Sequence, residues 1–219
     1  MKKIITLSII AMSFFCLSSK AQINKGSIML GGSLGGNFNN IKDPDTVTSK
    51  TNSFSISPAI GFAISDNTIV GFSLQYGFNN YKYYYNAQEQ KYHSYGAGIF
   101  ARKYKSLSKD FYLFGEGELM YDHYSYNYST SNNNGSEYDS KGNSIALNIT
   151  PGIAYSLTRC IQLEAGLQNL LSIGYSSAKE NAKDPNNLNY KTSNVNFSSS
   201  LSPVSLSSIS LGIRFLINK

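Results

Sequence analysis

Side-chain character alternates between apolar and polar with a period of two residues along most of the chain. The clearest case is the segment 144–176, where Ile145, Leu147 and Ile149 alternate with small or polar side chains. The same alternation resumes after a short turn near 157–160. A period of two is typical of a β-strand, in which successive side chains point to opposite faces. The segment therefore predicts a long β-hairpin with one apolar face and one small, polar face.

The same alternation recurs along the rest of the chain and predicts eight strands. They cover about 26–38, 53–64, 70–78, 94–102, 111–122, 144–157, 161–175 and 208–217. Their connections alternate in length, with short turns near 65, 107 and 158, and longer polar segments at 39–52, 80–90, 127–143 and 177–204. An even strand number with short turns at one end and longer loops at the other is typical of bacterial outer-membrane barrels. The predicted fold class is therefore all-β, an eight-stranded antiparallel transmembrane up-and-down β-barrel.

The composition of the polar face decides between a soluble sheet and a membrane barrel. A soluble sheet normally carries Lys, Glu, Asp and Arg on the face that meets water. Here the polar face is mostly Ser, Gly, Ala, Asn, Thr and Gln. Small side chains suit the narrow lumen of a barrel, and a continuous apolar face suits hydrocarbon. We expect the apolar face to point outward to lipid, and a soluble secreted β-sandwich is the main alternative.

The first 21 residues are typical of a cleaved secretory signal peptide. Two lysines precede an apolar run over 4–17, and a small-x-small cleavage site follows at 19–21. A membrane anchor is an alternative, although the run is short for a spanning helix. Lipoprotein processing at Cys16 is disfavoured, because the bulky Phe15 precedes it. We expect one domain over 22–219, exported to the bacterial outer membrane.

Charge and metal-ligand content exclude several classes of function. The chain has 19 basic and 13 acidic residues, and removal of Lys2, Lys3 and Lys20 with the signal leaves 16 basic residues. A net charge near +3 gives no argument for nucleic-acid binding. Two separated histidines do not form a metal-ligand set. We therefore predict no cofactor, no metal and no nucleic-acid partner.

Five ionisable residues fall on the predicted inner face: Arg102, Glu116, Glu118, Glu164 and Arg214. A buried unpaired charge is costly, so these groups should pair. The turn near 107 places Arg102 diagonally within reach of Glu116, and Glu164 and Arg214 lie at similar heights on the last two strands. We interpret the set as a salt-bridged network that closes the lumen, with an ion pathway or gate as the alternative.

Aromatic residues are frequent near the predicted strand ends. They could form girdles at the two membrane interfaces, or they could simply stack across neighbouring strands. One end carries Tyr81, Tyr83, Tyr84, Tyr85, Tyr121, Tyr124, Tyr126 and Tyr128, and the other carries Tyr104, Phe111, Tyr155 and Phe215.

The strand layout, the signal and the C-terminal sequence LGIRFLINK resemble the small outer-membrane β-barrel family that includes OmpA-like and OmpX-like proteins. Such proteins often end on an aromatic residue that the assembly machinery reads, whereas here four residues follow Phe215. The resemblance implies a porin-like barrel domain that interacts with outer-membrane lipid and the assembly machinery. We expect it to be a monomer.

The favoured function is a structural, adhesive or surface-interaction role, in which the external loops contact a surface ligand or host partner. We predict that the protein is not an enzyme. A small-solute porin or transport channel is the first alternative. The second is a lipid A-modifying hydrolase, because His123 and Ser125 share a face and resemble the His-activated serine of lipid A deacylases. No orienting carboxylate is identified, since Glu137 and Asp139 lie in a predicted loop.

Overall fold

The computed structural model describes residues 23–43, 46–84, 88–130, 137–167, 170–182, 190–199 and 209–217. The signal predicted over 1–21 lies outside these residues. The described residues form strands and turns and no helix, and none belongs to a helix long and apolar enough to span a membrane. The strands are β1 (Ile28–Asp43), β2 (Thr46–Ser65), β3 (Thr68–Tyr83), β4 (Gln88–Ser106), β5 (Phe111–Thr130), β6 (Glu137–Ser156), β7 (Ile161–Leu167), β8 (Leu171–Ala182), β9 (Tyr190–Ser199) and β10 (Ile209–Ile217).

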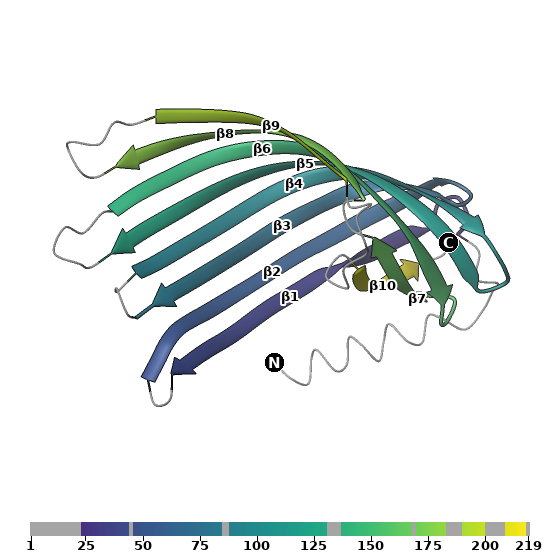
Figure 1. Ribbon diagram of the computed structural model, residues 1–219. Coiled ribbons are helices and arrows are strands. Elements are labelled where there is room, and N and C mark those ends of the chain that lie inside the picture. The colour runs from purple at the N-terminus through teal and green to yellow at the C-terminus, as the bar shows by residue number, and fades with distance from the viewer. Residues whose placement is uncertain are drawn as a thin grey trace.

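The strands form an eight-stranded antiparallel up-and-down barrel, as predicted. Neighbours in sequence pair from β1 through β7, β10 pairs with β7, and β10 then pairs with β1 to close the ring. Figure 1 shows the long strands as one curved sheet, with β7 and β10 completing the barrel at one end. We call this the turn end, because the three short connections near 66, 108 and 158 lie there; the opposite end is the loop end.

The register of the sheet sets the tilt of its strands. Following paired residues once around the ring from Phe111 leads back to β5 at Tyr121, ten residues further along. A stagger of this size over eight strands corresponds to a tilt of about 40°. A barrel of eight strands has an interior that side chains can fill.

The seventh and eighth strands of the barrel are both interrupted at one level. β6 pairs with β7 up to Gly152 and with β8 from Ile149 onward, so the break between β7 and β8 falls between these two residues of β6. In the eighth strand, β9 ends at Ser199 and β10 begins at Ile209, and the registers place these two residues just above and just below that same level. The prediction of one continuous strand over 161–175 is therefore wrong.

The strands extend much further toward the loop end than predicted. β1 and β2 cover most of 39–52, and β3 and β4 cover most of 80–90. β5 and β6 extend well into 127–143, while β8 and β9 account for much of 177–204. These segments were predicted to be loops because polar residues predominate on both faces of the strands there, so apolar alternation is weak or absent.

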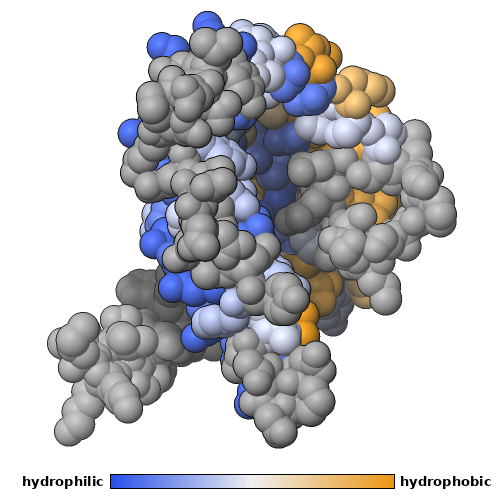
Figure 2. Space-filling view, turned by 60° about the vertical axis from the view of Figure 1, so that its left-hand side comes forward, coloured by the Kyte–Doolittle hydropathy of each residue, from blue (hydrophilic) through white to orange (hydrophobic). Residues whose placement is uncertain are grey.

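The two faces of the wall have the predicted polarity. Outward positions carry exposed apolar side chains, such as Phe72, Ile153 and Ile173. Inward positions carry Ser, Gly and ionisable residues, and Figure 2 shows hydrophilic residues around the hollow with hydrophobic ones on an outer side of the wall.

Several aromatic residues differ from the girdle arrangement. Tyr104 is buried inside the barrel, with 3 % of its surface exposed. Tyr124 stacks on Tyr92, and Tyr128 stacks on Tyr138, at ring-centroid distances of 6.1 and 5.1 Å. Stacking across strands therefore accounts for this part of the tyrosine set. Phe111 and Tyr155 do face outward at the turn end, with their rings 4.6 Å apart, whereas Tyr85 lies outside the described residues.

Candidate functional site

The lumen is filled by an apolar cluster at the turn end. These side chains come from strands all around the ring, so they join opposite walls. Its buried members are Ile23, Met29, Ala63, Ile69, Phe100, Tyr104, Tyr112, Phe114, Ala154 and Leu216. Close packing of this kind leaves little space for water or ions.

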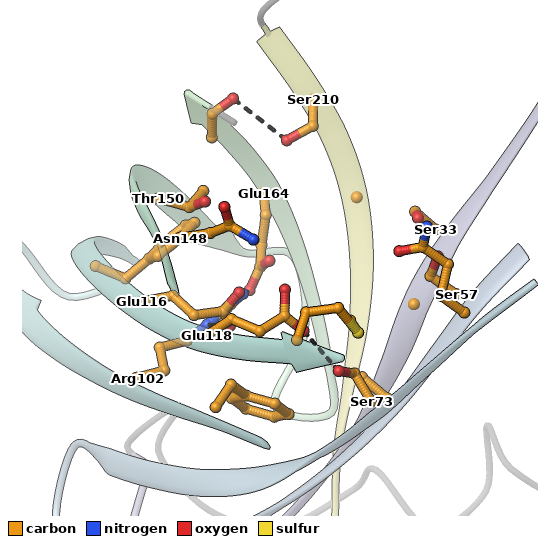
Figure 3. Close-up of a pocket in the computed structure, with 18 of the residues that line it drawn as sticks. Ser33, Ser57, Ser73, Arg102, Glu116, Glu118, Asn148, Thr150, Glu164 and Ser210 are labelled. Atoms are coloured by element: carbon orange, nitrogen blue, oxygen red, sulfur yellow. Dashed lines mark hydrogen bonds and ion pairs between the residues drawn. The ribbon is translucent and has the colours of Figure 1, made fainter. Parts of the chain in front are cut away.

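A chain of four charged side chains crosses the lumen next to this cluster, in the order Glu116, Arg102, Glu164, Arg214. Arg102 Nε donates to Glu116 Oε2 at 2.8 Å, and Arg102 Nη1 donates to Glu164 Oε1 at 2.5 Å. Arg214 Nε donates to the other oxygen of Glu164 at 3.0 Å. The residues belong to β5, β4, β7 and β10, so the chain links opposite sides of the barrel (Figure 3). We call these four residues the ion chain.

The guanidinium of Arg102 is almost completely enclosed, with 2 % of its side chain exposed. It lies 4.3 Å from the ring centroid of Phe114 and donates a hydrogen bond to the Tyr104 hydroxyl at 3.1 Å. Tyr104 in turn donates to Glu164 at 3.3 Å. A buried charge is tolerated only when it is paired and hydrogen-bonded, and Arg102 meets both conditions. The alternation of β4 places Arg102 and Tyr104 on the same inner face.

Two further carboxylates line the lumen outside the ion chain. Glu118 accepts a hydrogen bond from the Ser73 hydroxyl at 2.5 Å and forms no ion pair among the described residues. Asp122 has a buried oxygen, Oδ1, without a hydrogen-bond partner in the part of the chain that the structure describes. Both carboxylates point inward from β5, further toward the loop end than Glu116.

A cavity of about 490 Å³ lies beside the ion chain. Its lining includes Ser33 and Ser57 on one wall and Asn148 and Thr150 on another, together with Glu118 (Figure 3). The cavity is polar and meets the ion chain at Glu116, Glu164 and the two arginines. It is suited to water or a small polar solute, and the apolar cluster lies beyond it at the turn end.

Gly31 makes room for Arg214, its paired neighbour on β10. A Cβ atom at position 31 would occupy the volume of the Arg214 side chain. The glycine-rich GGSLGG segment of β1 thus contributes to the ion chain through the absence of a side chain.

Among the described residues no hydrogen bond joins either histidine to Ser125, although His93 of β4 lies directly opposite Ser125 of β5. His123 Nδ1 lies 2.7 Å from Asn143 Oδ1, which also accepts a hydrogen bond from the Tyr121 hydroxyl at 3.0 Å. Asp139 accepts a hydrogen bond from the Asn127 amide at 2.7 Å. No group of three or more His, Cys, Asp or Glu side chains within the described ranges could hold a metal ion.

Four of the five residues predicted to form the lumen network come together, and Glu118 lies apart from them. Arg102 is directly opposite Glu116 rather than diagonal to it. Sequence reasoning did not include Tyr104, Phe114 and Ser73 in the site. The parity of β4 would have identified Tyr104, because it lies two residues from Arg102, whereas Ser73 is recognised only through the register of the sheet.

No protein-family model matches the chain, and no curated protein matches it. Among solved structures, the chain is similar to a major outer membrane protein from Thermus thermophilus. The two are 10% identical, the match covers 87% of this chain and 99% of that chain, and the TM-score is 0.42.

Proposed function

We propose that the chain is an integral outer-membrane β-barrel of the small OmpA-like or OmpX-like kind, exported through a cleaved signal at 1–21, with a closed lumen and a structural or surface-interaction role. It needs no cofactor in this role. The observation that carries the proposal is the apolar belt around the outside of the barrel.

The belt has the height of a membrane. On β2 it extends from Phe54 to Ile64, and ten residues at about 3.3 Å each, tilted by about 40°, give a height of about 25 Å. Membrane barrels carry an outward apolar band of about this height. The described residues include 34 exposed large hydrophobic side chains, whereas 11 hydrophobic residues are buried and two of these are alanines. A soluble protein would bury most of these groups, so the ratio favours a lipid environment.

The ion chain and the apolar cluster support a closed lumen. Both cross the interior, and the ion chain is held by hydrogen bonds between paired charges. A small-solute channel is the second candidate, because the 490 Å³ cavity would form part of its path. Liposome swelling measures this directly. We expect no flux of small sugars or amino acids, and flux that changes in Arg102→Met would favour the channel.

The parts of the strands beyond the belt support a surface-interaction role. On the loop-end side of Phe54, β2 and β3 carry polar outward residues such as Lys50, Asn80 and Lys82. Similar polar segments of β4, β5, β6, β8 and β9 extend the wall above the belt. We propose that this polar extension is the surface through which the protein contacts a ligand or partner outside the cell.

Cell fractionation combined with gel migration tests the proposal. We expect the full chain in the outer-membrane fraction, extracted only by detergent, and we expect the unheated sample to migrate differently from the boiled one. A chain that stays soluble without detergent, with one gel mobility before and after boiling, would favour the soluble sandwich.

A further inference from the structure

Three lysines lie side by side on the outer surface of the wall, toward the loop end. Lys141 of β6 is directly opposite Lys179 of β8, and Lys179 is directly opposite Lys191 of β9. All three are exposed and share the outward face with the apolar residues Ile145 and Tyr175. Adjacent strands are about 4.8 Å apart, so the three ammonium groups can converge on one ligand. We call these residues the lysine row.

No carboxylate within the described part of the chain forms an ion pair with the lysine row. Asp139, two residues from Lys141, is hydrogen-bonded to Asn127 instead. Like charges at directly opposite positions of a sheet repel each other and destabilise it. The row therefore gains stability if an anion from outside the chain lies between the lysines.

On the opposite part of the wall, a carboxylate of the chain itself offsets the repulsion between neighbouring lysines. There Glu89 lies between Lys82 and Lys91 and pairs with them at 2.9 and 3.3 Å. This arrangement supplies its own carboxylate. The lysine row does not, although the two groups lie on the same outward face and toward the same end of the barrel.

The height of the lysine row relative to the belt points to lipid headgroups. On β6 the outward apolar residues end at Ile145, and Lys141 is four residues further on. Four residues at about 3.3 Å each and a tilt of about 40° place Lys141 roughly 10 Å above the end of the belt. The phosphate-bearing headgroups of a leaflet lie just above its hydrocarbon, and the outward face of the row is turned toward them.

The surface around the lysine row is hollowed. A hollow of about 370 Å³ is lined by the three lysines together with His123, Gly142, Asn143, Ser177, Ala178 and Asn181. Ammonium, amide and hydroxyl groups are the donors that bind phosphate oxygens and sugar hydroxyls. We propose that the lysine row binds the phosphate groups of a phosphorylated glycolipid in the outer leaflet. This inference rests on the proposed outer-membrane location.

Lipid binding by the full chain, refolded in phosphatidylcholine nanodiscs, tests the proposal. The probe is bis-phosphorylated lipid A, and native mass spectrometry measures the lipid retained. A basic residue near an anionic surface contributes about fivefold in affinity, so the triple variant Lys141→Gln/Lys179→Gln/Lys191→Gln should bind at least about tenfold more weakly. Lipid A without phosphates should bind the wild type and the variant equally weakly.

The matched control is Lys50→Gln/Lys82→Gln/Lys91→Gln, which removes the same charge from the outward face near Glu89. We expect its affinity for lipid A to stay within about twofold of the wild type. Equal loss in both triple variants would overturn the proposal, as would strong binding of the dephosphorylated lipid. Displacement of lipid A by an equal concentration of inorganic phosphate would assign the row to a soluble anion and overturn the lipid assignment.

Gel migration of unheated samples separates this proposal from the proposed function. If the wild type and both variants fold as barrels in nanodiscs, a lack of phosphate selectivity overturns only the role of the lysine row. If the wild type does not insert into a bilayer, the proposed function fails first.

Discussion

Replacement of Glu164 by Gln should destabilise the barrel strongly, because this carboxylate holds both arginines of the ion chain. Its side chain is 6 % exposed and accepts from Arg102 at 2.5 Å and from Arg214 at 3.0 Å. In the variant Arg102 keeps Glu116, but Arg214 loses its ion pair. Removal of one partner from a buried ion pair costs about 3–5 kcal/mol. Since Arg214 is partly exposed, we expect a loss of about 3 kcal/mol in the free energy of unfolding.

Urea unfolding in detergent micelles measures this loss. The chain contains no Trp, so circular dichroism or the fraction of folded barrel on gels replaces tryptophan fluorescence. With a denaturant slope of about 1–3 kcal/mol per M, the midpoint should fall by roughly 1 M or more. Glu118→Gln is the control, because Glu118 lines the same lumen but, among the residues that the structure describes, bonds only to Ser73. We expect its effect to stay near 1 kcal/mol.

The double variant Glu164→Gln/Arg214→Gln removes one charge of each sign. It should lose at least about 1 kcal/mol less than the sum of the two single variants, because the second change removes the charge that the first left unpaired. Two results would refute this reasoning: additive losses, or a loss in Glu164→Gln no larger than in Glu118→Gln.

Three further changes test other parts of the structure. Gly31→Ala should lower the free energy of unfolding in urea by about 1–3 kcal/mol, since the new Cβ overlaps Arg214. Gly115→Ala should be near neutral, because no heavy atom lies within 4 Å of its new Cβ, and equal effects of the two variants would contradict the role of Gly31. Ile149→Lys, in the middle of the belt, should lower the free energy of unfolding from a bilayer by about 2–4 kcal/mol, and Asn127→Lys, above the belt, by less than about 1 kcal/mol. Equal stability of the two variants would argue against a lipid-facing belt. The hydrogen bond from Lys82 lowers the pKa of Glu89, so the stability due to this pair is present above the usual glutamate pKa and is lost as the pH falls through the lowered value. In Lys82→Gln the pKa of Glu89, followed by carboxyl NMR shifts, should rise toward its usual value, and an unchanged titration would show that the pair is not formed.

The sequence predicts the fold where apolar and polar residues alternate. The belt segments of β2 and β6 show this, because Ile and Phe occupy every second position and indicate both the strand and its outward face. Alternation indicates no strand where both faces are polar, as in 177–182 of β8, and indicates one only weakly in β9 (Tyr190–Ser199). Val195 and Phe197 still alternate there with Asn194 and Asn196, so a weaker signal of β9 was present.

The candidate site is only partly readable from the sequence. Parity places Arg102, Glu116, Glu164 and Arg214 inside, and burial requires them to pair. Which carboxylate pairs with which arginine depends on distances across the lumen between β4, β7 and β10. Those distances follow from the stagger of the ring, which short turns determine for neighbours but not for strands on opposite walls.

Closure of the ring between β1 and β10 has a consequence for biogenesis. These strands stand near the two ends of the described chain, and the five pairs from Ile28–Ile217 to Gly32–Ile213 join them. Contacts between such distant segments form late, because they carry the largest loss of chain entropy. Until the last strand arrives, β1 presents an unsatisfied edge that invites wrong pairing. A chain truncated before Ile209 would therefore leave the facing edges of β1 and β7 without the strand that seals the ring.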